Sequence, residues 1–272
     1  MRTVYLGTSD FAAGILRRLA GGPHRPVLVV TRPDRPAGRG RTLTAPPVAL
    51  AARELGIDLD QPASVNDPES CARIAAARPD VLIVCAFGAL IKDPLLSDHE
   101  ILNVHPSLLP RWRGAAPVER AIMAGDAETG VSIMRLTAGL DSGPVCLQEA
   151  VAIEPGDTYA TLAARLEDLG GTLLLRALDE RPDFAEQDEA GVTYAEKLTA
   201  QDRTIDPQAD PAAAERTVRA LHPHIGARLQ LPDGSFLGVQ RARLDDGAFV
   251  PELVLPPGGR PMAYDDYLRG RR

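Results

Sequence analysis

Two nearly continuous apolar runs constrain the fold of this chain more than any other feature. Val81-Leu82-Ile83-Val84-Cys85 is apolar throughout, and Ile101-Leu102-Asn103-Val104 is interrupted only by one amide. Such runs are typical of strands that are buried on both faces of a parallel sheet. Shorter apolar runs at residues 4–6 and 27–30 alternate with helical patterns, for example at residues 48–55. The alternation predicts an α/β fold with a mostly parallel, doubly wound, Rossmann-like sheet, whose ligands bind at the carboxyl ends of its strands.

The second half of the chain changes in character after a long helical pattern at residues 158–178. The stretch from Asp179 to Pro211 is polar and rich in Asp, Glu, Gln and Pro, which suits a linker on the surface. One further helical pattern and several short strand candidates follow, so we expect a second, smaller β-rich C-terminal domain. The expected division is residues 1–183 for the first domain, 184–206 for the linker and 207–272 for the C-terminal domain.

The composition narrows the class of function. Of the 272 residues, 44% are hydrophobic and the formal net charge is −7, which indicates a globular chain without a broad positive field for nucleic acid. No stretch approaches the ~18 apolar residues of a membrane span, and the N-terminus carries no export signal. We therefore expect a cytoplasmic protein without a membrane partner. Three cysteines without C-x-x-C spacing predict buried thiols in a reducing compartment and no metal site.

Several common catalytic motifs are missing from the sequence. It contains no G-x-G-x-x-G after the first apolar run, no Walker A sequence, no H-E-x-x-H and no G-x-S-x-G. This disfavours dinucleotide-dependent chemistry, nucleoside-triphosphate chemistry and hydrolases with a nucleophile elbow. The remaining candidates for chemistry are concentrated between residues 101 and 143.

Asn103 and His105 stand at the end of the second apolar run. Because alternate side chains of a strand point to the same side, the amide and the imidazole should converge at its carboxyl end. Prolines make Pro106–Pro110 a rigid loop, and Asp141 lies in a glycine-flanked loop that can return a carboxylate towards the imidazole. Taken singly, such residues are more often structural. A His at the end of a strand is usually a hydrogen-bonded structural group, and an Asn or Asp there usually closes a turn. Together they predict an acyl-transfer site without a covalent nucleophile.

The motifs around these residues resemble those of the 10-formyltetrahydrofolate-dependent formyltransferases. The resemblance is carried by Asn103-x-His105-Pro106-Ser107-Leu108-Leu109-Pro110 and by Gly139-Leu140-Asp141-Ser142-Gly143. Three further segments are similar to the family members that act on methionyl initiator tRNA: Gly7–Ala12, Pro33–Arg41 and Arg111–Pro117. The resemblance thins after Leu198, where we expect a C-terminal domain shorter than the β-barrel usual in the family.

The resemblance implies a reaction and a set of site residues. The formyl group of 10-formyltetrahydrofolate, which is released as tetrahydrofolate, would pass to the α-amine of methionyl initiator tRNA through a tetrahedral intermediate, without a metal. Asn103 would donate a hydrogen bond to the oxyanion, His105 would stabilise it and move a proton, and Asp141 would orient His105 and assist the proton transfer. The implied folate-binding residues are Phe87, Gly88, Leu90, Ser107, Leu108, Leu109 and Pro110.

A basic loop is the implied contact with the tRNA. Residues 32–41 hold four arginines and one aspartate in an otherwise acidic chain. A solvated, mobile loop is the simple alternative, because charged stretches rich in Pro and Gly are commonly just that. By resemblance, Arg35, Arg39 and Arg41 would bind the acceptor end of the tRNA, and phosphate contacts would make that binding depend on salt.

Two other functions stay open at this point. A sugar-nucleotide N-formyltransferase would use the same chemistry and would suit the shortened C-terminal domain, but Ala115-Ala116-Pro117 and the basic loop argue against it. A non-catalytic paralogue that binds folate or RNA is the second alternative. The intact Asn103, His105 and Asp141 argue against that function.

Overall fold

The computed structural model describes residues 1–37, 40 and 42–270. They form two compact units that interleave along the chain. The first unit comprises Met1–Ala115, Gly130–Ala150 and Ala164–Tyr194, and the second comprises Ala116–Thr129, Val151–Ala163 and Ala195–Arg272. The expected division into residues 1–183, 184–206 and 207–272 stays a prediction.

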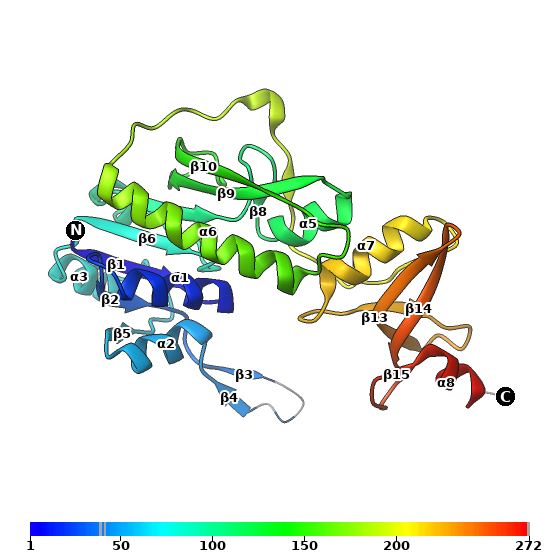
Figure 1. The fold of residues 1–272 in the computed structure, drawn as a ribbon. Helices are drawn as coiled ribbons and strands as arrows, with labels where there is room; N and C mark the ends of the chain where they lie inside the picture. Colours follow the sequence, from blue (N-terminus) through cyan, green and yellow to red (C-terminus); the bar gives the residue numbers. More distant parts are fainter. Residues whose placement is uncertain (38–39, 41, 271–272) are drawn as a thin grey trace. The chain divides into compact units, whose positions relative to one another are not determined.

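A seven-stranded sheet with the order β10-β9-β7-β6-β1-β2-β5 forms the centre of the first unit (Figure 1). Each pair of neighbours along the series β7-β6-β1-β2-β5 runs parallel, whereas β9 runs antiparallel to β7. The predicted α/β class with a mostly parallel sheet is therefore confirmed. The strands are β1 Thr3–Gly7, β2 Pro26–Val30, β5 Asp58–Asp60, β6 Val81–Cys85, β7 Ile101–His105, β9 Glu128–Arg135 and β10 Val145–Ala152.

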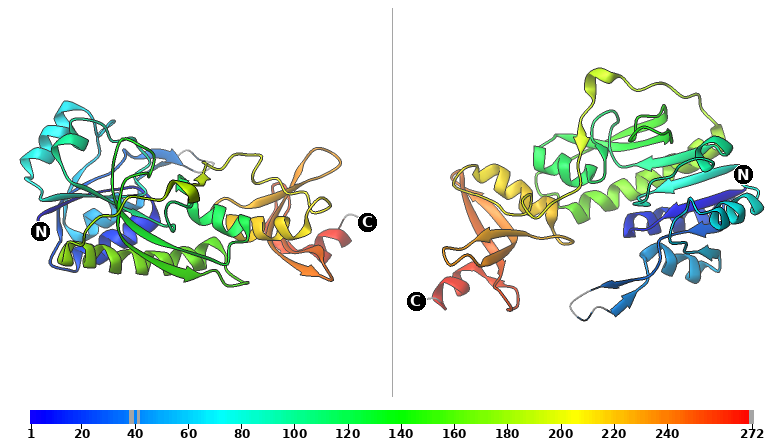
Figure 2. Two further views of the ribbon diagram at one scale, coloured as in Figure 1. Left: turned by 90° about the horizontal axis from the view of Figure 1, so that it is seen from above. Right: turned by 180° about the vertical axis from the view of Figure 1, so that it is seen from behind.

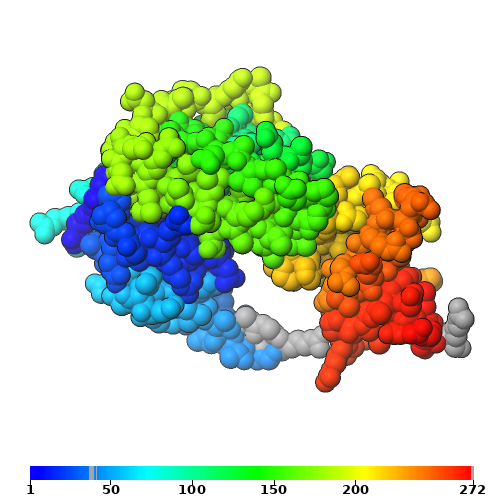
Figure 3. All heavy atoms as spheres, in the orientation of Figure 1, coloured from blue at the N-terminus to red at the C-terminus, as the bar shows by residue number. Residues whose placement is uncertain are grey.

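Helices cover both faces of this sheet (Figures 1 and 2). One face carries α1 Asp10–Ala20, α2 Pro47–Leu55 and α6 Tyr159–Glu180, and the other carries α3 Pro68–Ala76 and α4 Leu95–Asp98. In the space-filling view, α6 lies beside α1 (Figure 3). Gly170 permits this approach, because a methyl group there would come within 3.1 Å of Val104 and 3.2 Å of Ile15. Within the described residues, no helix combines the length and the apolar character needed to cross a bilayer.

The apolar runs of the sequence become the central strands. All residues of β6 and β7 are buried, and Leu82 and Ile101 pack in one cluster with Ile74 of α3 and Leu95 of α4. Because β1, β6 and β7 are parallel, their carboxyl ends meet at one edge of the sheet. Polar residues that follow these strands are thereby brought together.

The segment expected as a basic loop forms a short hairpin at its described ends. β3 Arg35–Ala37 pairs antiparallel with β4 Thr42–Thr44, with Arg35 opposite Thr44. Arg35 is exposed on this hairpin, whereas Arg39 and Arg41 lie outside the described residues. A second two-stranded sheet is formed by β8 Arg113–Gly114 and β11 Tyr194–Ala195.

The second unit contains the expected β-rich C-terminal region. Its antiparallel sheet has the order β12-β13-β14-β15, and Val218 and Leu221 of α7 pack against Val239 of β13 in its core. The elements of this unit are α5 Pro117–Ala124, α7 Pro211–Leu221, β12 Ala227–Gln230, β13 Phe236–Asp245, β14 Ala248–Leu255, β15 Met262–Ala263 and α8 Tyr264–Arg269.

A partly buried carboxylate links α5 to the segment that precedes α7. Asp202 accepts hydrogen bonds from the Thr199 backbone N–H at 2.8 Å, the Thr199 hydroxyl at 2.6 Å and Arg120 Nη1 at 2.7 Å. Burial by itself would raise the pKa of Asp202, but these hydrogen bonds and the Arg120 charge outweigh burial and lower the pKa from 3.8 to about 2. The ionised carboxylate therefore stabilises the folded state above about pH 4, and this contribution is lost as the pH falls towards 2.

We expect Asp202→Asn to lower the free energy of unfolding by about 1–2 kcal/mol at pH 7, since solvent screens part of the interaction. The difference from the wild type should shrink as the pH falls from about 4 to about 2, which urea unfolding at a series of pH values would measure. Asp246→Asn makes the same charge change at an exposed turn and should alter stability by less than about 0.5 kcal/mol. A constant difference at all pH values would contradict this account.

Candidate active site

The end of β7 places an amide and an imidazole on the same side of the sheet. Asn103 pairs with Met134 of β9 and His105 pairs with Ser132, so the two residues are alternate members of one strand. Their side chains are almost fully buried. Buried polar groups need hydrogen-bond partners, and the partners of both residues come from loops at the carboxyl edge.

Asp141 supplies the carboxylate that joins them. Asn103 Nδ2 donates a hydrogen bond to Asp141 Oδ1 at 3.3 Å, and His105 Nδ1 lies 3.7 Å from Asp141 Oδ2. The backbone N–H of Gly114 donates to the same Oδ2 at 2.8 Å. The structure therefore brings together the three residues that the sequence selected as catalytic candidates.

The contacts of His105 define which of its nitrogens can exchange a proton. Nε2 lies 2.8 Å from the carbonyl oxygen of Trp112. Because a carbonyl oxygen only accepts, Nε2 must carry a hydrogen in both the neutral and the charged imidazole. Nδ1 is then the nitrogen that gains or loses a proton, and it is the nitrogen that faces Asp141.

The loop that carries Asp141 depends on close backbone packing. Asp141 has a φ of +44°, in the left-handed region, which Asp tolerates better than most residues. At Gly143, a methyl group would collide with the carbonyl oxygen of Arg135. Glycine is thus required at Gly143 by the approach of another backbone segment.

The proline-bounded loop after β7 is held by one local hydrogen bond and by side chains of β9 and β10. The Ser107 hydroxyl donates to the carbonyl of Arg111 at 2.7 Å, and the Leu109 N–H donates to the Ser132 hydroxyl at 3.1 Å. Gln148 Nε2 donates to both the Leu109 carbonyl at 2.9 Å and the Ser132 hydroxyl at 2.8 Å. Ser107 and Leu109 are buried, whereas Leu108 and Pro110 are partly exposed.

The other expected folate residues follow β6. The backbone carbonyls of Phe87, Gly88 and Leu90 accept hydrogen bonds from Thr8, Arg32 and Asn66 respectively, which fixes the path of this segment. The Phe87 side chain is buried in the core, and the Leu90 side chain is 67% exposed. Phe87 and Leu90 also line a cavity of about 270 Å³. Its other lining residues are Thr31, Arg32, Pro62, Ala63, Ser64, Val65, Asn66, Ala89 and Lys92.

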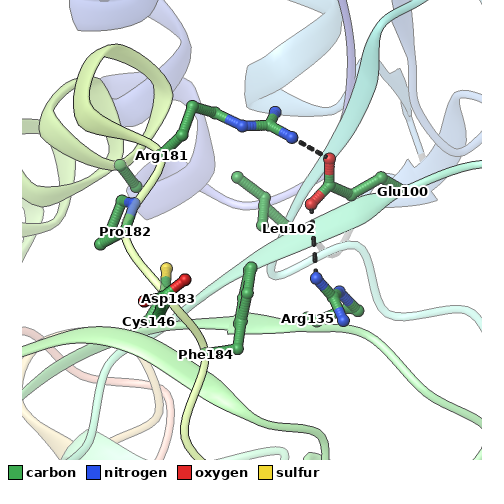
Figure 4. A pocket seen from close by; sticks show the side chains of 9 residues that line it. Glu100, Leu102, Arg135, Cys146, Arg181, Pro182, Asp183 and Phe184 are labelled. Atoms are coloured by element: carbon green, nitrogen blue, oxygen red, sulfur yellow. Dashed lines mark hydrogen bonds and ion pairs between the residues drawn. The ribbon is translucent and has the colours of Figure 1, made fainter.

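A larger cavity of about 320 Å³ lies near the amino end of β7, and Figure 4 shows the side chains that line it. It is lined by Glu100, just before β7, and by Leu102 near the start of that strand, whereas His105 ends the strand, about 16 Å from Glu100 along the chain direction. Glu100 pairs with Arg181 at 2.8 Å and with Arg135 at 3.7 Å, so both arginines of this cavity are already engaged by one carboxylate. The predicted site residues are not among its lining residues.

Sequence reasoning missed several residues that hold the candidate site. The hydroxyl of Ser132 and the amide of Gln148 organise the loop after β7, and Gln187 contacts the loop that carries Asp141. Pairing β7 with β9 would have pointed to Ser132, since it lies opposite His105. The other two residues have no local signal, because their partners are distant in sequence.

The burial of the thiols agrees only partly with expectation. Cys85 is fully buried, and burial raises its pKa to about 12, whereas Cys71 and Cys146 are partly exposed. In the part of the chain that the structure describes, no group of three His, Cys, Asp or Glu side chains could hold a metal ion.

Comparisons of the sequence identify a family, and comparisons of the structure identify a shared fold. The sequence profile of the formyl transferases matches residues 1–178. A methionyl-tRNA formyltransferase from Cereibacter sphaeroides is 40% identical over 292 aligned residues, which cover 99% of this chain and 96% of that protein. A methionyl-tRNA formyltransferase structure from Clostridium thermocellum superposes with a TM-score of 0.69 at 13% identity, covering 97% of this chain and 99% of the other. HypX from Aquifex aeolicus in complex with tetrahydrofolic acid superposes with a TM-score of 0.68 at 17% identity, covering 98% of this chain and 47% of the other.

We expect Gly143→Ala to lower the free energy of unfolding by about 1–3 kcal/mol and to displace the loop of Asp141, because the added methyl meets a backbone oxygen that cannot turn away. Thermal unfolding measures the first effect, and amide hydrogen exchange of residues 139–143 measures the second. Gly156→Ala is the matched control, since a methyl there meets nothing within 4 Å. Equal stability of the two variants would argue against the packing described here.

Proposed function

This chain belongs to the formyl transferase family, and on that premise we propose that it transfers the formyl group of 10-formyltetrahydrofolate to the α-amine of methionyl initiator tRNA. The convergence of Asn103, His105 and Asp141 on one small volume carries the proposal. The extended similarity to a methionyl-tRNA formyltransferase supports the choice of acceptor. We also propose that the protein works in the cytoplasm.

Asn103 supplies a donor for the negative charge that forms in the reaction. When the amine attacks the formyl carbon, an electron pair moves onto the formyl oxygen. The Asn103 amide has two N–H groups, and one of them is used by Asp141 Oδ1. The second N–H serves the oxyanion, and because it is fixed beforehand it requires no reorganisation during the reaction.

His105 and Asp141 move the proton. The attacking amine must lose a proton, and the folate nitrogen must gain one when its bond to the formyl carbon breaks. Nδ1 of His105 takes the first proton and returns it to the folate nitrogen, because Nε2 is engaged with Trp112. Asp141 holds the imidazole and stabilises its charged form.

The cavity next to the segment after β6 fits part of the folate. It combines apolar side chains from Phe87, Val65 and Leu90 with the cationic side chains of Arg32 and Lys92. An aromatic donor that ends in carboxylates matches both features. We propose that Phe87, Gly88 and Leu90 bind the folate together with Ser107, Leu108, Leu109 and Pro110.

The exposed hairpin is the proposed tRNA contact. Arg35 is exposed, and Arg39 and Arg41 belong to the same basic segment of the sequence. A chain with a net charge of −7 needs such a local patch to approach an RNA backbone.

We expect His105→Ala to lower kcat for formyl transfer by about 10²–10⁴-fold and Asn103→Ala to lower it by about 10²–10³-fold. The assay follows labelled formyl from 10-formyltetrahydrofolate to charged initiator tRNA, and amino-sugar nucleotides are offered as rival acceptors. Equal transfer by the wild type and His105→Ala would exclude the proposed site. Transfer to the sugar nucleotide alone would replace the proposed acceptor and keep the chemistry.

Replacing Arg35, Arg39 and Arg41 together by Ala should raise KM for tRNA and leave KM for the folate unchanged. The slope of log affinity against log salt concentration should become shallower by roughly 0.7 for each phosphate group that the variant no longer neutralises. Arg17→Ala removes an exposed arginine from α1 and should change neither quantity. An unchanged salt slope in the triple variant would remove the tRNA role from this hairpin.

A further inference from the structure

The segment after α6 returns to the candidate active site. Ala185 exchanges two backbone hydrogen bonds with Val145, at 2.8 and 2.9 Å, which anchors the segment beside the start of β10. Further along, the backbone carbonyl of Thr193 accepts a hydrogen bond from the N–H of Arg113 at 2.9 Å. The residues between these anchors therefore run close to the loop that carries Asp141.

Gln187 lies between the two anchors and is in contact with that loop. Its Nε2 donates to the backbone carbonyl of Asp141 at 2.8 Å and to that of Gly143 at 2.7 Å. Its Oε1 accepts from Arg113 Nε at 3.0 Å. Both N–H groups of the amide are used, and a flipped amide would direct its oxygen at two carbonyl oxygens. The amide thus has a single satisfactory orientation.

Arg113 fixes that orientation. Its side chain is buried, and besides Gln187 it contacts Glu189 through Nη2 at 3.4 Å. The next residue, Gly114, donates its N–H to the Asp141 carboxylate. The same short strand, β8, therefore holds Asp141 in two ways: directly at its carboxylate, and through Gln187 at its backbone.

Asp141 needs such support. Its backbone is in the left-handed region, and its carboxylate must stay between Asn103 and His105. Two hydrogen bonds from one amide clamp the loop on either side of Ser142 and so restrain the backbone from which the carboxylate extends. We propose that Gln187 is a positioning residue for Asp141; its effect on catalysis rests on the proposed function, and its effect on the loop does not.

The variant Gln187→Glu keeps the size of the side chain and the acceptor for Arg113, but it sets a carboxylate oxygen against two carbonyl oxygens. We expect kcat for formyl transfer to fall about 10- to 100-fold, with KM for folate and for tRNA changed less than about threefold. Gln187→Ala should lower kcat in the same range, and thermal unfolding checks that both variants fold. Glu189→Gln is the control, because Glu189 contacts Arg113 and is largely exposed; it should keep wild-type kcat.

A double-mutant cycle tests whether Gln187 acts through Asp141. In an Asp141→Asn background, Gln187→Glu should lower kcat less than about threefold further, because the group that it positions has already been impaired. A loss of the same size in both backgrounds would overturn the proposal, since it would show a general structural effect.

Amide hydrogen exchange gives a readout that does not depend on activity. The Gly114 N–H is protected by Asp141 Oδ2, so its exchange should accelerate at least about tenfold in Gln187→Glu and stay unchanged in Glu189→Gln. Unchanged exchange at Gly114 in Gln187→Glu would overturn the proposal even if the wild type transfers formyl groups. If exchange at Gly114 accelerates but the wild type transfers no formyl group, the proposed function is wrong and the positioning role of Gln187 is supported.

Discussion

The Asp141 carboxylate is the group on which the geometry of the site depends. One oxygen receives the Asn103 amide, and the other receives the Gly114 N–H and faces His105. The end of β7 and the strand β8, which lie 27 to 38 residues before Asp141 in the chain, thus share a single charged group. A carboxylate in such a confined place is stable only while its oxygens are hydrogen-bonded, so the same bonds that satisfy Asp141 also fix the neighbouring strand end and loops.

Much of this arrangement could be predicted from local sequence patterns. The apolar run at Val81–Cys85 coincides with β6, and the alternation of Asn103 and His105 placed both on one side of β7. Local patterns suffice here because a strand that is buried on both faces must be apolar. The glycine-flanked position of Asp141 also carried information, since such loops bring backbones close together.

Long-range hydrogen bonds could not be predicted in this way. Gln187 lies in a polar stretch that reads as a surface linker, yet its amide contacts a loop more than forty residues earlier in the chain. Gln148 and Arg113 likewise act on partners that no spacing in the sequence identifies. The size of a cavity would also have been a misleading guide to the site. The larger cavity surrounds Glu100, whose carboxylate already pairs with Arg135 and Arg181.

The hydrogen bond between His105 and the Trp112 carbonyl also limits how protons reach and leave the imidazole. With one ring nitrogen permanently occupied and the ring itself shielded from water, the imidazole has a single route of exchange. A proton that Nδ1 takes from one reactant must leave from the same nitrogen to the other reactant. In the proposed reaction the proton lost by the amine equals the proton gained by the folate nitrogen, so a complete turnover needs no proton from the solvent. The site can therefore exclude water while the one-carbon unit moves between nitrogens.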